Sequence, residues 1–255
     1  MESGYVEYNQ GKLYFERNGN GTPIVFVHGF SLDQRMWDNQ KEYFSKNYQV
    51  ITYDLRGFGQ SSLPNGSYSH HDDLNALLNY LNIKAAHIVG LSLGGEIALD
   101  FVLSYPDSVL SLTLIDSSLG GFSGKVDWDV KAKEEGLEKA KDNWLHHPVF
   151  APTISKPDVK LKLSNFVTSY SGWHWLNHDP RSKLNPSTKD RLSEINKPVQ
   201  LIVGSEDLSY YHDIASFIND NIKNSKLADM PNSGHMVNLE QPDLTNSLID
   251  KFIAA

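Results

Sequence analysis

The chain alternates short runs of apolar residues with longer stretches that have helical periodicity. Four largely apolar runs lie at residues 24–27, 50–53, 87–89 and 110–115. Strands that are covered on both faces have such continuous apolar sequences, because neither face meets water. These runs therefore predict central strands of a parallel sheet.

Helical patterns separate these predicted strands. They cover residues 37–44, 72–81 and 95–105, and Pro106 ends the last of them. Strand and helix alternating at this spacing imply right-handed crossovers and an α/β fold. Two shorter alternating stretches near the start of the chain, at residues 6–8 and 13–15, predict an edge hairpin.

The alternation stops in the middle of the chain, where we predict no buried strand between residues 118 and 186. This stretch carries charge runs, several prolines and four of the five tryptophans, namely Trp128, Trp144, Trp173 and Trp175. We interpret it as a helical insertion that lies over one end of the sheet.

Strand-like patterns resume after the insertion, at residues 199–203 and 224–230, and residues 243–253 are typical of a closing helix. We therefore divide the chain into three segments. Residues 1–117 form the first part of a core, residues 118–186 a helical cap insertion, and residues 187–255 the second part of the core.

Composition narrows the classes of partner. Lys plus Arg is 23 and Asp plus Glu is 31, which gives a formal charge of −8 and makes nucleic acid an unfavourable ligand. No apolar run approaches the ~20 residues that span a bilayer, and the start of the chain does not resemble a secretory signal. Without cysteine, the chain has no disulfide and no thiolate nucleophile. We expect a cytoplasmic monomer or homodimer that binds neither nucleic acid nor membranes and acts on a small molecule.

The stretch Gly90-Leu91-Ser92-Leu93-Gly94 stands between a predicted buried strand and a predicted helix. In the pattern G-x-S-x-G the serine lies on a sharp strand-to-helix turn that exposes its hydroxyl group. The amide of Leu93 then points from a helix N-terminus to the place where an oxyanion would form. This context predicts Ser92 as a nucleophile, and an ordinary Gly-rich turn is the alternative.

A serine nucleophile needs a base and a group that orients the base. Glu206 and Asp207 follow the strand at 199–203, and His235 follows the strand at 224–230. Loops at the carboxyl ends of parallel strands are where such sheets place their sites. The chain order Ser92, Asp207, His235 is the order of the hydrolase elbow fold. Glu206 is the alternative acid, and an ordinary exposed loop histidine is the alternative interpretation of His235.

Five motifs in this order resemble those of the α/β-hydrolase superfamily, over nearly the whole chain. They are His28-Gly29-Phe30, the segment from Asp54 to Ser61, the elbow from Gly90 to Gly95, Gly204 to Asp207, and Ser233-Gly234-His235 with Glu240-Gln241-Pro242. The resemblance implies a mostly parallel eight-stranded sheet flanked by helices, with a helical cap.

The resemblance also implies roles for individual residues. Asp207 matches the position of the family's catalytic acid, and the backbone N–H groups of Phe30 and Leu93 would form the oxyanion hole. His28 would support the oxyanion loop rather than act as a base, and Arg56 would hold loops together.

We expect no metal and no cofactor. His70-His71-Asp72-Asp73 contains metal-ligating residue types, but neighbours at a helix start point in different directions, and Asp72 and Asp73 suit a helix N-terminus. The glycine-rich loops typical of dinucleotide and nucleotide binding are also missing from the sequence.

A serine at the elbow favours acyl chemistry, whereas the family's dehalogenases and epoxide hydrolases use aspartate there. The chain resembles small esterases and enol-lactone hydrolases. We predict a serine hydrolase that cleaves a small carboxylic ester or lactone through an acyl-enzyme. The alternatives are a carbon–carbon bond hydrolase or perhydrolase of the same fold, and a slow-turnover ligand receptor or signalling hydrolase.

Overall fold

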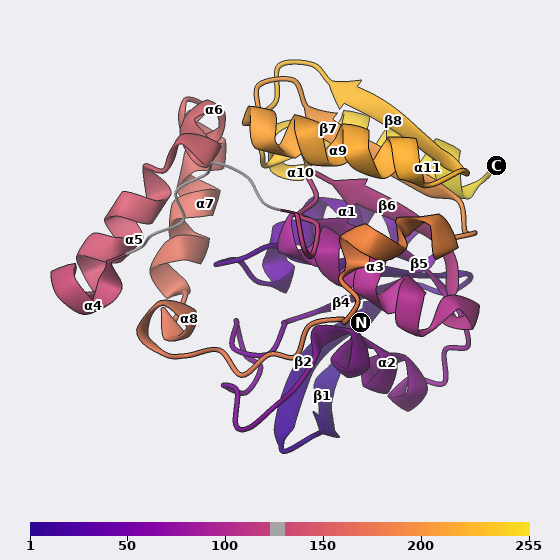
Figure 1. Ribbon diagram of the computed structural model, residues 1–255, viewed down its shortest axis with the longest axis horizontal. Helices are drawn as coiled ribbons and strands as arrows, with labels where there is room; N and C mark the ends of the chain where they lie inside the picture. Colours follow the sequence, from indigo (N-terminus) through magenta and orange to yellow (C-terminus); the bar gives the residue numbers. More distant parts are fainter. Residues whose placement is uncertain (123–130) are drawn as a thin grey trace.

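A computed structural model describes residues 1–122 and 131–255 of the chain, so Trp128 and the rest of 123–130 in the predicted cap lie outside the described residues. Eight strands form one sheet in the order β1-β2-β4-β3-β5-β6-β7-β8 (Figure 1). They are β1 (Glu2–Tyr8), β2 (Gly11–Asn18), β3 (Pro23–Val27), β4 (Gln49–Tyr53), β5 (Ala86–Leu91), β6 (Val109–Ile115), β7 (Val199–Gly204) and β8 (Ser225–Met230).

Strand direction matches the prediction of a mostly parallel sheet. β2 pairs antiparallel with β1 and with β4, and the remaining neighbours pair in parallel. The expected edge hairpin is the pair β1 and β2. The eight-stranded α/β fold with flanking helices is thus confirmed.

Alternate residues of the central strands pack into two apolar layers, one on each face of the sheet. Val25 and Ile88 belong to a layer with α2 (His70–Tyr80), α3 (Leu93–Ser104) and α9 (Ser209–Asn221). Ile24 and Val89 belong to a layer with α1 (Asp38–Phe44) and α11 (Pro242–Ile253). Because both faces are covered, these strands need apolar residues at every position.

Short 3-10 helices join several of these elements. They are η1 (Gln34–Trp37), η2 (Pro106–Ser108), η3 (Pro148–Phe150) and η4 (Thr188–Glu194). The helix predicted at 37–44 is α1, which directly follows Trp37, the last residue of η1. Asp33 begins η1 because its carboxylate accepts a hydrogen bond of 3.0 Å from the N–H of Arg35.

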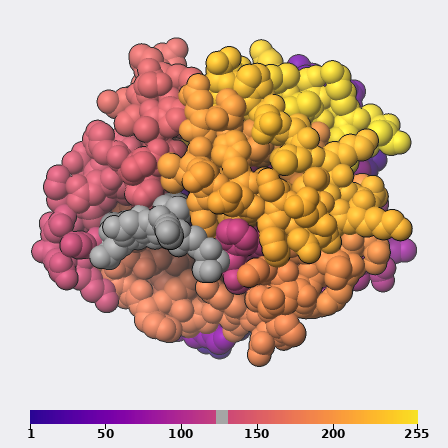
Figure 2. Space-filling model, turned by 45° about the horizontal axis from the view of Figure 1, so that its top comes forward, coloured from indigo at the N-terminus to yellow at the C-terminus, as the bar shows by residue number. Residues whose placement is uncertain are grey.

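Between β6 and η4 the described residues form helices and no strand. These helices are α4 (Ala132–Glu135), α5 (Leu137–Leu145), η3, α6 (Ala151–Ile154), α7 (Pro157–Ser169) and α8 (Trp173–Leu176). They lie beside the sheet in Figure 1, and on the face drawn in Figure 2 they flank the C-terminal third of the chain. The boundaries of the cap at residues 118 and 186 remain our proposal.

The segment after α8 returns to the core along α2 and α3. Arg181 pairs with Glu96 of α3 at 3.2 Å, and the N–H of Ser182 donates to the carbonyl of Tyr68 at 2.7 Å. These contacts attach the end of the cap to the core.

The helices of the described residues are short. None is longer than α7 and α9, which have 13 residues each, whereas ~20 apolar residues are needed to span a bilayer. No helix in this part of the chain is therefore long and apolar enough to cross a membrane.

Candidate active site

Ser92 lies on the turn between β5 and α3 with φ 54° and ψ −115°. Residues other than glycine rarely adopt this backbone conformation, and such strain is typical of a nucleophile elbow. The turn is held by hydrogen bonds from the N–H of Ser92 to Ile115 at 2.9 Å and from the N–H of Ser118 to the Ser92 carbonyl at 3.0 Å. The predicted helix at 95–105 begins two residues earlier, at Leu93, so Ser92 directly precedes the helix.

Two glycines permit this turn. A Cβ atom on Gly90 would overlap the backbone oxygen of Gly94, and a Cβ on Gly94 would overlap the carbonyl oxygen of Val27. Neither position tolerates a side chain without movement of the backbone. The glycines of the motif therefore allow the close approach of β3, β5 and α3 around Ser92.

The structure brings His235 and Asp207 together beneath the cap. Asp207 follows β7, His235 follows β8, and His235 Nδ1 lies 2.8 Å from Asp207 Oδ2. Because an ionised carboxylate only accepts hydrogen bonds, Nδ1 carries the proton and Nε2 is left as the acceptor. The side chains of His235 and Asp207 are 5% and 0% exposed, whereas Glu206, the alternative acid, is exposed.

A buried carboxylate holds the loop that carries His235. Glu240 accepts hydrogen bonds from the backbone N–H groups of Gly234 at 3.0 Å and Met236 at 3.3 Å, on either side of the histidine. The same carboxylate accepts from Thr153 Oγ1 at 2.7 Å and pairs with Lys156 Nζ. Glu240 therefore connects the histidine loop to the cap.

The predicted oxyanion residues, Phe30 and Leu93, line the same cavity as Ser92. Within the described residues, no hydrogen bond engages the backbone N–H of either residue. Beneath this loop, His28 Nδ1 donates to the Gly29 carbonyl at 2.8 Å and Nε2 accepts from the Leu55 N–H at 2.9 Å. Burial lowers the pKa of His28 to about 4, so the imidazole is neutral and both its nitrogens are used in supporting the loop.

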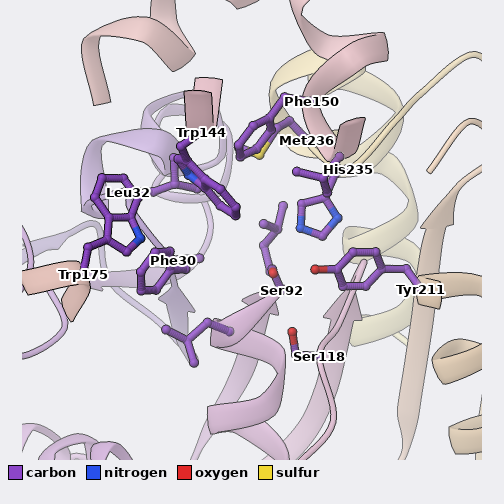
Figure 3. A pocket seen from close by; sticks show the side chains of 14 residues that line it. Phe30, Leu32, Ser92, Ser118, Trp144, Phe150, Trp175, Tyr211, His235 and Met236 are labelled. Atoms are coloured by element: carbon purple, nitrogen blue, oxygen red, sulfur yellow. The ribbon is translucent and has the colours of Figure 1, made fainter. Parts of the chain in front are cut away.

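A cavity of about 270 Å³ opens over Ser92. In Figure 3 Ser92 stands between an aromatic group of Phe30, Trp144 and Trp175 and the pair His235 and Tyr211. The remaining lining side chains are mostly apolar, namely Leu32, Leu91, Val149, Phe150 and Met236, with Ser118 as a further hydroxyl. Among the described residues, no lysine, arginine, aspartate or glutamate lines it. Of the tryptophans predicted in the cap, Trp144 and Trp175 reach the cavity.

Tyr211 is a site residue that our sequence interpretation missed. Its ring centroid lies 4.2 Å from that of His235, and its hydroxyl makes side-chain hydrogen bonds with Ser92 and Ser118. Burial raises the pKa of the Tyr211 phenol, so the hydroxyl keeps its proton. Tyr211 lies in the first turn of α9, and no sequence pattern distinguishes it from a core residue.

Asp116 was also missed. It follows β6, is buried, and its Oδ1 accepts a hydrogen bond from the N–H of Gly204 at 2.8 Å. One oxygen of Asp116, one of Asp207 and one ring nitrogen of His235 lie within 4.8 Å of one another. Residues of these types can ligate a metal, but Nδ1 of His235 is already bonded to Asp207. An acidic residue type directly after a buried strand is the signal that could have identified Asp116.

Arg56 and the acidic pair at the start of α2 lie away from the cavity. Arg56 donates to the two oxygens of Asp73 at 2.6 and 3.0 Å and to the carbonyl of Tyr8 at 3.0 Å. Asp72 stands at the helix start, where Ser69 is the capping residue. Asp73 lies in the first turn of α2 and is also the buried partner of Arg56. Through these hydrogen bonds Arg56 joins β1 to α2.

Comparisons with known proteins agree with this fold. A family model of the alpha/beta hydrolase fold matches residues 22–196. A solved N-acyl homoserine lactone degrading enzyme, Est816, is 30% identical, with 98% of this chain and 100% of that chain covered and a TM-score of 0.84. A thermophilic esterase from Thermogutta terrifontis is 25% identical, with coverage of 100% and 98% and a TM-score of 0.85.

A curated relative is similar over most of its length as well. The 3-oxoadipate enol-lactonase 2 of Acinetobacter baylyi is 26% identical, with 89% of this chain and 86% of the relative covered. These proteins include an esterase and two enzymes that act on lactones, and they match 89–100% of this chain. Together with the match to the family model, they show that the chain belongs to the α/β-hydrolase fold family.

Proposed function

We propose that the chain is a serine hydrolase that cleaves a small, neutral carboxylic ester or lactone through an acyl-enzyme. The observation that carries the proposal is the position of Ser92 on a strained elbow, in an apolar cavity that also holds His235 bonded to Asp207. This set supplies a nucleophile, a base, a group that orients the base, and two unengaged amides.

The reaction follows from these positions. Ser92 Oγ attacks the carbonyl carbon while His235 Nε2 takes the hydroxyl proton, and the oxyanion accepts hydrogen bonds from the amides of Phe30 and Leu93. His235 then gives the proton to the leaving oxygen as the carbon–oxygen bond breaks. Water, activated by His235, adds to the acyl-enzyme and releases the acid and free Ser92. Asp207 orients the imidazole and stabilises its protonated form throughout.

The cavity favours neutral acyl groups. A carboxylate on the substrate would lose its hydration among aromatic side chains, and the described lining residues offer it no cationic partner. A volume of about 270 Å³ suits a compact substrate. Similarity to an esterase and to enzymes that act on lactones supports ester or lactone hydrolysis.

The nucleophile is tested by Ser92→Ala with p-nitrophenyl butyrate as substrate. We expect kcat/KM to fall by at least ~10³-fold, as when a triad member is removed from other serine hydrolases. A fluorophosphonate probe should label wild type on Ser92 and leave the variant unlabelled. Equal rates for the two proteins would exclude Ser92 as the nucleophile.

The acyl preference is tested with a matched substrate pair. p-Nitrophenyl butyrate and p-nitrophenyl hemisuccinate have acyl chains of similar length, and only the second carries a terminal carboxylate. We expect kcat/KM to favour butyrate by at least ~10-fold, because the carboxylate would be desolvated without a partner. Equal or reversed preference would contradict a neutral acyl site.

The same panel separates the alternatives. N-acyl homoserine lactones, a β-diketone and a dienoate are added to the esters. Faster turnover of the carbon–carbon substrates than of any ester would favour a carbon–carbon bond hydrolase. A single stoichiometric turnover of every substrate would favour a receptor.

A further inference from the structure

We propose that Asp116 is a positioning residue, which holds a proton at neutral pH and donates it in a hydrogen bond to Asp207. The proposal deepens the proposed function, on which it rests, because it concerns the acid that orients His235. It assigns a role to a buried carboxyl group that the mechanism above does not use.

The backbone brings the two carboxyl groups together. Asp116 follows β6, and its N–H donates to the carbonyl of Ile202 in β7 at 2.9 Å. Gly204, at the end of β7, then contacts both acids. Its N–H donates to Asp116 Oδ1 at 2.8 Å, and its carbonyl accepts from the N–H of Asp207 at 3.0 Å. Hydrogen bonds to Gly204 therefore hold both acids next to the end of β7.

The hydrogen-bond donors decide which acid carries the charge. Asp207 accepts from the N–H of Leu208 at 2.7 Å and from His235 Nδ1 at 2.8 Å. Asp116 accepts from Gly204 through Oδ1, whereas its buried Oδ2 has no donor among the described residues. A carboxylate is stabilised by the donors it accepts from, so the negative charge belongs on Asp207 and the proton on Asp116.

The proton resolves a conflict in the structure. Two ionised carboxylates only accept hydrogen bonds, so they would repel each other in a site that water does not reach. With one proton, Asp116 Oδ2 becomes a donor to Asp207 and the orphaned oxygen gains a partner. Burial, reinforced by the charge of Asp207, raises the pKa of Asp116 well above its ordinary value, which agrees with this arrangement.

The other titratable groups near Asp116 do not offer a competing partner. Glu240 acts on Asp116 through its charge, but it pairs with Lys156. His235 faces both acids, and its Nδ1–H donates a hydrogen bond to Asp207. A hydrogen bond from Asp116 fixes the orientation of Asp207 and shares its negative charge. Asp207 then attracts the protonated imidazole less strongly than an isolated carboxylate would.

Two substitutions of similar size test the role of the proton. Asp116→Leu removes the donor, so kcat should fall about 10- to 100-fold with little change in KM, as for loss of a hydrogen bond to a charged group. The rising limb of the pH–rate profile should also move to higher pH. Asp116→Asn can accept from Gly204 and donate to Asp207, so it should restore most of the lost kcat and the wild-type limb.

One result of these profiles would overturn the proposal. If Asp116 were ionised in the native protein, Asp116→Asn would remove a negative charge close to His235 and move the limb down by about one pH unit or more. This comparison needs only wild type and Asp116→Asn. It therefore decides the question even where thermal unfolding shows that Asp116→Leu does not fold.

Infrared difference spectroscopy tests the proton without any substrate. At neutral pH, wild type minus Asp116→Asn should show the carbonyl-stretch band of a protonated carboxylic acid, with the isotope shift expected in heavy water. A carboxylate band in its place would overturn the proposal. Because this measurement requires no turnover, it can fail or succeed independently of the proposed ester hydrolysis.

Discussion

The Ser92 side chain faces polar groups in a cavity that is otherwise apolar. Tyr211 packs its ring against His235 and directs its hydroxyl toward Ser92 and Ser118 (Figure 3). A neutral phenol can donate to the serine oxygen while the serine donates to the histidine. Such a donor stabilises negative charge as it develops on Oγ, which requires that the phenol stay protonated, and burial ensures this.

Replacing Tyr211 by phenylalanine should separate its two contributions. Tyr211→Phe retains the ring beside His235 and removes the hydroxyl, so we expect kcat to fall about 3- to 10-fold with KM nearly unchanged. Steady-state kinetics with a p-nitrophenyl ester measure this. Tyr210→Phe is the matched control, because Tyr210 does not line the cavity. A wild-type kcat in Tyr211→Phe would show that the hydroxyl does not assist the serine.

For individual residues, sequence patterns identify those that belong to motifs. Ser92, Asp207 and His235 each follow a predicted strand, and the fold brings all three to one place. Their catalytic roles remain predictions. Asp116 follows a strand in the same way and was predictable on that ground. Tyr211 was not, because its position depends on how the first turn of α9 packs against the histidine loop.

At the scale of helices and strands, apolar runs predicted the central strands well, because a strand that is covered on both faces has apolar residues at successive positions. Helix starts were predicted less well. α3 begins at Leu93 rather than at residue 95, because the elbow requires the helix to start directly after Ser92. The arrangement of the cap was not predictable, since its helices are short and its contacts are made by tertiary packing rather than by periodicity.

The contacts of one side chain, Glu240, link the cap to the loop that carries His235, the proposed base. The Glu240 carboxylate accepts from two N–H groups of the histidine loop and from Thr153 and Lys156 of the cap. The loop contacts set the position of His235, and the cap contacts set the distance between cap and core. Substitutions at the two ends of this network should therefore have different kinetic effects.

Glu240→Gln should disturb the histidine loop. The amide is neutral and adds donors next to the Lys156 ammonium, so we expect a loss of about 2 kcal/mol in unfolding free energy and a fall of about 10-fold in kcat. Thr153→Val removes only one cap contact and should change kcat much less. Urea unfolding and steady-state kinetics measure both variants. A larger effect on kcat in Thr153→Val than in Glu240→Gln would contradict this division.

At the scale of the whole molecule, the junction of core and cap contains a half-buried histidine, His174, that is neutral at pH 7. His174 of α8 stacks on Phe58 of the core at 4.4 Å between ring centroids and accepts a hydrogen bond from the Tyr170 hydroxyl at 2.8 Å. Burial is the main cause that lowers the pKa of His174 to about 4 from 6.5. A protonated His174 would therefore be unfavourable in the folded chain, and mild acid should weaken the junction.

The His174 contribution to the unfolding free energy should therefore depend on pH. The unfolded chain binds the His174 proton at higher pH than the folded chain, so this contribution to stability is complete above pH 6.5 and is lost as the pH falls toward about 4. Asp54 and Asp100, with pKa values raised to about 6, act in the opposite direction, so only a comparison with a variant isolates His174.

Between about pH 7 and about pH 5, wild type should lose about 2 kcal/mol more unfolding free energy than His174→Phe, as measured by urea unfolding at each pH. His174→Gln, which also does not titrate, should show the same smaller loss even though its shape and hydrogen bonds differ. The same smaller loss in both variants would show that protonation of His174, rather than a change in packing, causes the pH dependence. Equal losses in wild type and both variants would mean that His174 titrates alike in the folded and unfolded chains, and that the junction of core and cap is not what acid weakens.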